Sequence, residues 1–156
     1  MVALALFQPD IPQNTGTILR LSACLGVPVH VIGPTGFELS DRSLKRAGMD
    51  YLDHVNLTRH IGWTAFEAWR RQAGGRLVLM TTKAETRYTD FAFAADDVIL
   101  LGRESAGVPD EVHEAVDHRL LVPMVRGLRS INVAMTAAMA LGEALRQTDG
   151  FPRKKE

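Results

Sequence analysis

Short apolar runs alternate along this chain with longer segments whose apolar residues recur at the helical period. The runs are rich in Val, Ile and Leu, which is typical of parallel strands that are buried on both faces of a sheet. We therefore predict an α/β fold with a mostly parallel sheet flanked by helices. The expected strands are residues 2–7, 27–32, 55–57, 77–81, 98–101 and 120–123, and the expected helices are residues 12–25, 38–47, 63–72, 110–116 and 130–147.

Length and charge limit the classes of protein that fit. The 156 residues are 46% hydrophobic and show no repeat and no linker, so we expect one domain at residues 1–150 and a flexible tail at residues 151–156. The 18 basic and 18 acidic side chains balance, so any nucleic-acid surface must be a local patch. We expect a cytoplasmic protein without a membrane segment, in which the single cysteine, Cys24, is buried.

The stretch "LLGRESAGVPDE" at residues 100–111 places two glycines, Gly102 and Gly107, directly after a predicted strand. It is not a P-loop, because Val108 and Pro109 stand where that motif needs Lys and Ser or Thr. It is not a nucleophile elbow either, because Arg103 occupies one of the glycine positions. Two readings remain: an ordinary turn between a strand and a helix, or a backbone that a ligand approaches closely.

The last predicted helix is apolar around its whole circumference, with Ala, Met, Leu and Val on every side. One face of a sheet cannot bury all of these side chains, so a second surface must cover the helix. The second surface is either another copy of this chain or the rest of a monomer that surrounds a central helix.

Several kinds of site are not expected. The five histidines form no recognisable set of metal ligands with the single cysteine, and no Gly-x-Gly-x-x-Gly follows the first predicted strand. In the first helix, Arg20 lies about 160–200° from the apolar stripe and faces away from the sheet. Taken alone, such an arginine is either a solvated side chain or a group that acts outside its own core.

The chain resembles the SPOUT methyltransferases in three stretches that stand in the order and spacing of the motifs of that superfamily: "PDIPQNTGTILRLSACLG" (9–26), "LGRESAGVP" (101–109) and "LVPMVRGLRSINVAMTAAM" (121–139). Over residues 1–148 it is similar to the small single-domain subfamily that methylates the ribose 2′-oxygen of the tRNA wobble nucleotide, a cytidine or uridine. The resemblance implies a deep C-terminal trefoil knot, the cofactor S-adenosyl-L-methionine (AdoMet), a homodimer and no metal.

The resemblance also implies roles for individual residues. The cofactor contacts of the family match Met80, Gly102, Val122 and Ser130, and its catalytic arginine matches Arg20. Supporting polar positions of the family match Asn14, Glu104 and Asn132. Basic residues that are candidates for contacts with RNA phosphates are Arg42, Arg46 and Arg129.

We therefore expect an AdoMet-dependent tRNA 2′-O-ribose methyltransferase that recognises the anticodon stem-loop. Three alternatives stay open. The chain could methylate a ribose at another position in tRNA or rRNA, because substrate choice depends on surface shape. It could also be a non-catalytic RNA-binding module with the same fold, or an unrelated small α/β nucleotide-binding protein.

Overall fold

The computed structural model describes residues 1–46 and 52–154, apart from the side chains of residues 41, 45, 46 and 52. Within these residues, seven strands form one sheet in the order β3-β2-β1-β6-β4-β7-β5, and every pair of neighbours is parallel. The strands are β1 (Ala3–Phe7), β2 (Val29–Ile32), β3 (Leu57–His60), β4 (Leu77–Met80), β5 (Thr86–Arg87), β6 (Val98–Leu101) and β7 (His118–Leu121). The predicted α/β class with a parallel sheet is confirmed.

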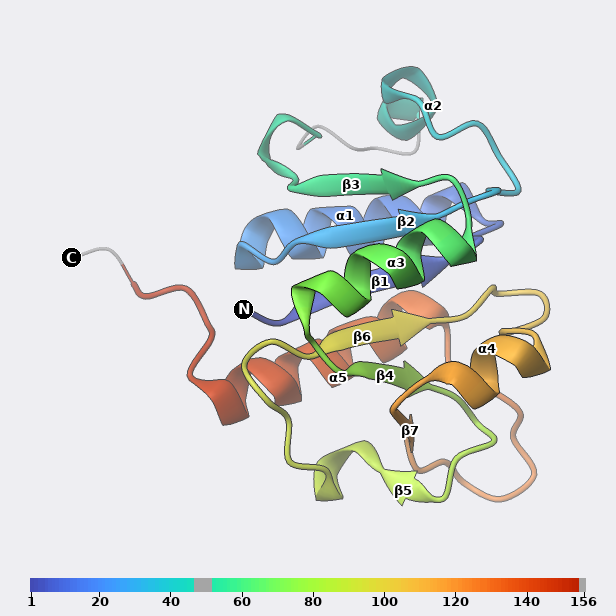
Figure 1. The fold of residues 1–156 in the computed structure, drawn as a ribbon, viewed down its shortest axis with the longest axis vertical. Helices are drawn as coiled ribbons and strands as arrows, with labels where there is room; N and C mark the ends of the chain where they lie inside the picture. The colour runs from blue at the N-terminus through green and yellow to red at the C-terminus, as the bar shows by residue number, and fades with distance from the viewer. Residues whose placement is uncertain (47–51, 155–156) are drawn as a thin grey trace.

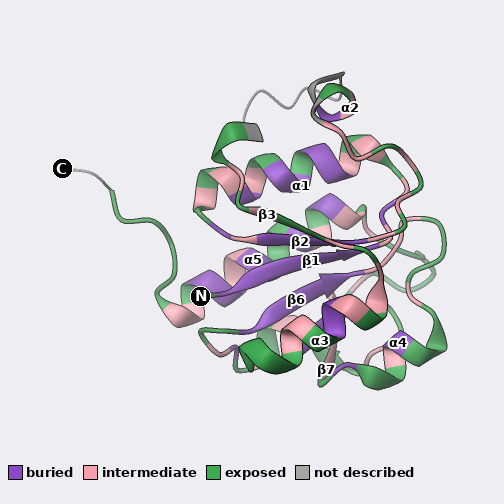
Figure 2. Ribbon diagram, turned by 45° about the horizontal axis from the view of Figure 1, so that its top comes forward, coloured by how far each residue is buried: buried purple, intermediate pink, exposed green. Residues whose placement is uncertain are grey.

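Helices cover both faces of this sheet (Figure 1). Helices α1 (Pro12–Leu25) and α5 (Val133–Thr148) pack on one face, against a core that includes Leu4, Ile99 and Leu141. Helices α3 (Trp63–Ala73) and α4 (Asp110–Ala115) lie on the other face, against a core that includes Phe7 and Leu100. The short α2 (Asp41–Arg46) precedes β3. Figure 2 shows the resulting burial, which is greatest in the central strands.

The element boundaries agree best where the sequence contains strong local signals. Helix α1 has the predicted bounds, with Pro12 in its first turn and Gly26 at φ +68° as its C-cap. The third strand was predicted at residues 55–57, but it spans Leu57–His60. That strand lies at an edge of the sheet and exposes Thr58 and Arg59, so apolar residues do not mark its extent. The two-residue β5 was not predicted, because both of its side chains are exposed.

Helix α1 presents an outward face that carries Arg20. Ile18, Leu19 and Ser22 are buried, whereas Arg20 is exposed, as the helical period predicted. The expectation that Cys24 is buried was wrong, because Cys24 is exposed. It lies four residues after Arg20 and therefore shares the outward face of the helix.

Helix α5 is only half covered within one chain. Its buried residues pack against the sheet and α1, and they are Ala134, Ala137, Ala140, Leu141, Ala144 and Leu145. On the opposite side, Met135 is 64% exposed and Met139 is 40% exposed. The part of the chain that the structure describes contains no helix long and apolar enough to cross a membrane.

Two histidines share a hydrogen bond inside the aromatic cluster on the α3 face of the sheet. His30 Nδ1 lies 2.9 Å from His60 Nε2, and the His30 ring lies 4.1 Å from the ring of Trp69. Burial, together with the nearby His60, lowers the pKa of His30 to about 4. Burial also lowers the pKa of His60. Both rings are therefore neutral in the folded protein near pH 7.

We predict that acid destabilises this fold through His30. An unfolded histidine binds its proton near pH 6.5, so between about pH 6.5 and 4 the unfolded state holds more protons than the folded state. The free energy of unfolding should fall over this range, by on the order of 3 kcal/mol when the titration is complete. Urea unfolding at several pH values measures the fall. It should be smaller in His30→Phe and retained in the control His54→Gln, and equal falls in all three proteins would contradict the prediction.

Candidate active site

A cavity lies at the carboxyl edge of the sheet, where the loops after three adjacent strands meet. Strands β6, β4 and β7 are neighbours, and each continues into a loop that lines the cavity. These loops begin at Thr81, Gly102 and Val122. The cavity has a volume of about 700 Å³. The carboxyl edge of a parallel sheet is where ligands bind in open α/β folds.

The cavity wall brings together most of the residues that the sequence predicted. The predicted residues in the wall are Asn14, Met80, Gly102, Glu104, Val122, Ser130 and Asn132. Arg20, Arg42 and Arg129 are exposed and do not line the cavity. The side chain of Arg46 lies outside the described part of the structure.

The loop after β6 is a tight turn that requires its glycines. Arg103 N donates to Gly107 O at 3.0 Å, and Gly107 N donates to Arg103 O at 2.9 Å. Gly107 has φ +61°, a conformation that favours glycine. A Cβ atom on Gly102 would lie 2.8 Å from the backbone carbon of Gly107, so only glycine fits there without a shift of the backbone. The loop thus exposes bare backbone to the cavity.

Asn132 ties two helices together at the cavity. Its Oδ1 accepts hydrogen bonds from the backbone N–H groups of Ala134, at 2.8 Å, and Met135, at 3.4 Å, so it caps the start of α5. Its Nδ2 donates to Oδ1 of Asn14 in α1 at 3.1 Å. Side chains from two of the three sequence motifs are therefore in contact.

A pair of carboxyl groups joins the second motif, residues 101–109, to the first. The backbone N–H of Asp10 donates to Glu104 Oε2 at 3.1 Å, and the Ser105 hydroxyl donates to Asp10 Oδ2. Burial and the side chain of Asp10 raise the pKa of Glu104, whereas the backbone N–H of Asp10 lowers it. Hydrogen bonds from Glu104 and Ser105 lower the pKa of Asp10.

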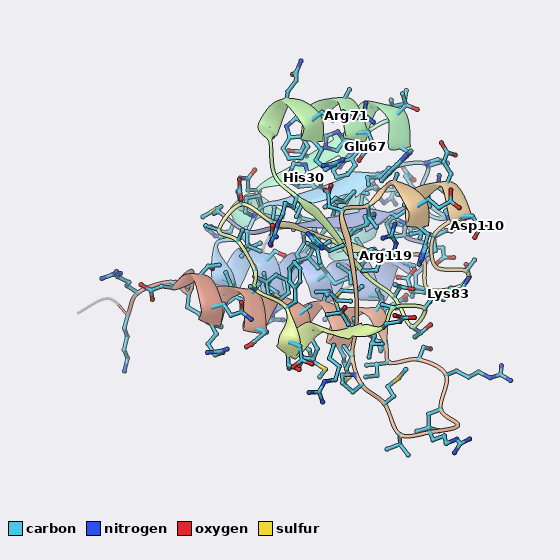
Figure 3. The ribbon with its side chains drawn as sticks, turned by 60° about the horizontal axis from the view of Figure 1, so that its bottom comes forward. His30, Glu67, Arg71, Lys83, Asp110 and Arg119 are labelled. Carbon is cyan, nitrogen blue, oxygen red and sulfur yellow. The ribbon has the colours of Figure 1, made fainter. Side chains whose placement is uncertain are left out.

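Sequence reasoning missed several polar residues of the site. Asp10 stands in the first motif, two residues before Pro12, but nothing in the sequence pairs it with Glu104. The residues Lys83, Asp110 and His113 also line the cavity. Figure 3 shows Lys83 and Asp110 at the same end of the molecule. Their positions after a strand end and at a helix start were the only available signal.

Among the residues that the structure describes, no group of three or more His, Cys, Asp or Glu side chains could hold a metal ion.

Comparison with solved structures shows that this architecture is shared. The chain superposes with a TM-score of 0.88 and 41% identity on a structure described as "Structural insights into the 2-OH methylation of C/U34 on tRNA", with 94% of this chain and 95% of the other covered. It also superposes, at a TM-score of 0.84 and 26% identity, on an AdoMet-bound rRNA methyltransferase from Sinorhizobium meliloti. That match covers 93% of this chain and 56% of the larger protein.

Sequence comparison gives the same family. A protein of Beijerinckia indica named tRNA (cytidine(34)-2′-O)-methyltransferase is 61% identical over 150 residues, which cover 96% of this chain and 94% of that protein. The model of the SpoU rRNA methylase family matches residues 1–142. The resemblance seen in the three sequence motifs is thereby confirmed, and this chain belongs to the SpoU rRNA methylase family.

Proposed function

We propose that this protein transfers a methyl group from AdoMet to the ribose 2′-oxygen of the wobble nucleotide, a cytidine or uridine, in tRNA, and that it does so in the cytoplasm. The observation that carries the proposal is the cavity itself, whose wall gathers residues from all three motifs at the carboxyl edge of the sheet. The name of the Beijerinckia indica relative and the described subject of the 41% identical structure support the same substrate.

The residues of the cavity fit AdoMet. A volume of about 700 Å³ lies in the range of small-molecule sites, roughly 300–1,000 Å³. Met80, Leu101 and Val122 supply apolar walls for a nucleoside, and the backbone at Gly102 supplies hydrogen-bonding groups that a side chain would block. Ser130 and Asn132 add polar groups to the same wall. When bound, AdoMet supplies a methyl group that is already activated as a sulfonium.

We assign to Arg20 the role of holding the reacting ribose. A guanidinium stays protonated in proteins, so Arg20 is a poor general base. It can instead orient the 2′-hydroxyl or a neighbouring phosphate and stabilise the negative charge that develops on the oxygen. A phosphate oxygen or water then takes the proton. Much of the rate gain comes from holding the hydroxyl in line with the methyl group.

We propose a homodimer in which Arg20 acts at the cavity of the partner subunit. Arg20 is exposed on the outward face of α1 and does not line the cavity of its own chain. The exposed Met135 and Met139 of α5, with Ile11 at the start of α1, form the apolar surface that a second copy would cover. The contact between Asn14 and Asn132 holds the starts of these two helices together. An apolar face of this kind is typical of a subunit interface.

We also propose that the chain forms a trefoil knot at its C-terminal part. Strand β7 lies between β4 and β5, although residues 81–85 join β4 directly to β5. The chain enters β7 from α4 on one face of the sheet and leaves it toward α5 on the other face. This crossing, inside the loop closed by residues 81–97, supports a threaded chain, which is rare among proteins.

We propose that local basic patches contact the anticodon stem-loop, because the chain has a formal net charge of zero. Arg129 is exposed in the loop between β7 and α5, near Val125 and Leu128, which are 75% and 70% exposed. Arg42 is exposed on α2, and Arg46 belongs to the same helix. These arginines would bind phosphates and position the RNA without reading its sequence.

Transfer to the wobble ribose can be measured directly. Incubation of the protein with methyl-labelled AdoMet and unmodified tRNA, followed by nucleoside mapping, should place the label on the ribose of nucleotide 34. The same tRNA with a 2′-deoxyribose at that position should take no label there. Label at another tRNA position, or label only in rRNA that is supplied in a parallel reaction, would show that the alternative substrate is the correct one. No transfer despite AdoMet binding would indicate a non-catalytic RNA-binding module.

Arg20→Ala and Gly102→Ala should affect different steps: the first should lower the rate of methyl transfer, and the second should lower the affinity for the ligand. Because Arg20 is proposed to hold the ribose and not the cofactor, Arg20→Ala should leave the affinity for S-adenosylhomocysteine within a few fold but lower the single-turnover rate by at least about 100-fold. Gly102→Ala places a Cβ 2.8 Å from Gly107 and should weaken ligand binding itself. Calorimetry and single-turnover kinetics separate the two. A near-normal rate in Arg20→Ala would remove this residue from the mechanism.

Mixed dimers test whether Arg20 serves the partner subunit. Arg20→Ala and Gly102→Ala chains are co-expressed with different tags, and the mixed dimer is purified. One of its two sites then has an intact cavity and an intact partner arginine, so it should show about half of the wild-type activity. If Arg20 serves its own cavity, both sites are damaged and the mixed dimer should be as inactive as its parents. A monomer that transfers methyl groups would also contradict the shared site.

A further inference from the structure

The carboxyl groups of Asp10 and Glu104 come from segments that are far apart in the sequence and are held together at the cavity. Asp10 precedes α1, and Glu104 belongs to the turn after β6 that lines the cavity. The Asp10 backbone donates to Glu104 Oε2, and the hydroxyl of Ser105 donates to Asp10 Oδ2. These contacts dock the turn at residues 102–107 onto the start of α1.

Close backbone packing prevents either segment from moving away easily. On the Asp10 side, a Cβ atom on Gly36 would lie 2.7 Å from Cβ of Asp10, and Gly36 N donates to Pro9 O at 2.9 Å. On the Glu104 side, Gly102 packs against the backbone of Gly107. Backbone packing therefore fixes the local conformation of each segment, and the contacts between Asp10, Glu104 and Ser105 join the two segments.

Two adjacent carboxylates repel each other, and one proton between them removes the repulsion. Oδ1 of Asp10 is buried and has no hydrogen-bond partner within the described residues. If the neighbouring Glu104 is protonated, its O–H group can donate a hydrogen bond to this oxygen. The pKa values move in the directions that such a pair requires. The pKa of Glu104 is raised by burial and by Asp10, and the pKa of Asp10 is lowered by its hydrogen bonds to Glu104 and Ser105.

We propose that Asp10 is a positioning residue that shares one proton with Glu104 and thereby holds the turn at residues 102–107 in the conformation that binds AdoMet. The inference rests on the proposed function and adds a control of cofactor affinity by pH. The direction in which cofactor affinity changes with pH follows from the raised pKa of Glu104. A group whose folded pKa is raised stabilises the docked turn at low pH, and this contribution is lost as the pH rises through that pKa. Cofactor affinity therefore falls when the pair becomes doubly ionised.

Other charged groups face the same cavity and must be separated from this effect. They are Lys83, Arg103, Asp110 and His113. Arg103 is directed elsewhere, because its guanidinium donates to Gly107 O and Gln8 Oε1 and lies over the ring of Phe7. All four are present in the variants of Asp10 as in the wild type, so their contribution to binding cancels in the comparison.

Calorimetry with S-adenosylhomocysteine, from about pH 5 to about pH 8, tests the proposal. The wild-type affinity should fall roughly two- to tenfold as the pH rises, the equivalent of one hydrogen bond. Asp10→Asn keeps an acceptor for Ser105 and offers Glu104 an N–H in place of the shared proton, so its affinity should stay flat over this range. Asp10→Ala has no acceptor for Ser105 and no donor for Glu104, so it should bind S-adenosylhomocysteine more weakly than Asp10→Asn at every pH.

Asp96→Asn, which removes an exposed carboxylate at the opposite end of β6, is the matched control and should follow the wild-type curve. Glu104→Gln removes the other carboxyl group of the pair, so the pH dependence of ligand affinity should be lost in this variant too. It keeps the proposal testable if Asp10→Asn does not fold, which thermal unfolding would reveal. Parallel curves for the wild type and for both amide variants would overturn the inference. Absence of ligand binding by the wild type at every pH would instead contradict the proposed function.

Discussion

The position of β6 between β1 and β4 is the constraint on which the site depends. Ile99 lies opposite Leu4 on one side and Val78 on the other, so one late strand joins the first strand of the chain to its C-terminal part. Leu101 lies opposite Leu6, and the chain therefore leaves both strands at the same edge of the sheet. Asp10 and Glu104 meet because they follow these paired strand ends within a few residues. The backbone hydrogen bonds of the sheet thus set the geometry of the cavity.

The sequence predicted the central part of the fold well, because strong local signals and burial agreed there. The bounds of α1 follow from Pro12 and Gly26, and those of β6 follow from four buried apolar residues. Prediction failed where burial does not control the structure. Strand β3 exposes Thr58 and Arg59, and β5 is two exposed residues at the other edge. The predicted burial of Cys24 was wrong: its sequence neighbours are apolar, but its place in the helix, four residues after Arg20, puts it on the outward face.

The residues of the candidate site could be predicted only where they belong to the sequence motifs or directly follow a predicted strand. The seven predicted residues in the cavity wall belong to those stretches or lie at the end of β4, whereas the partnership of Asp10 with Glu104 depends on strand pairing. Pairing of this kind links residues 94 positions apart and leaves no periodic trace in a single sequence. The outward direction of Arg20 did follow from helical geometry. Its proposed target lies on another chain, which the fold of one chain does not contain.

The polar outer strands have a consequence for how copies of this protein can associate. β3 carries Thr58 and Arg59, and β5 is followed by Asp90, which forms an ion pair with Arg87. Short, charged margins discourage the addition of foreign strands and so oppose fibrous growth. The exposed methionines of α5 instead offer an apolar helical patch that tolerates small misfits, since thioether side chains adapt their shape. In the proposed homodimer, a second copy that covers this patch would form a closed pair rather than an open-ended stack.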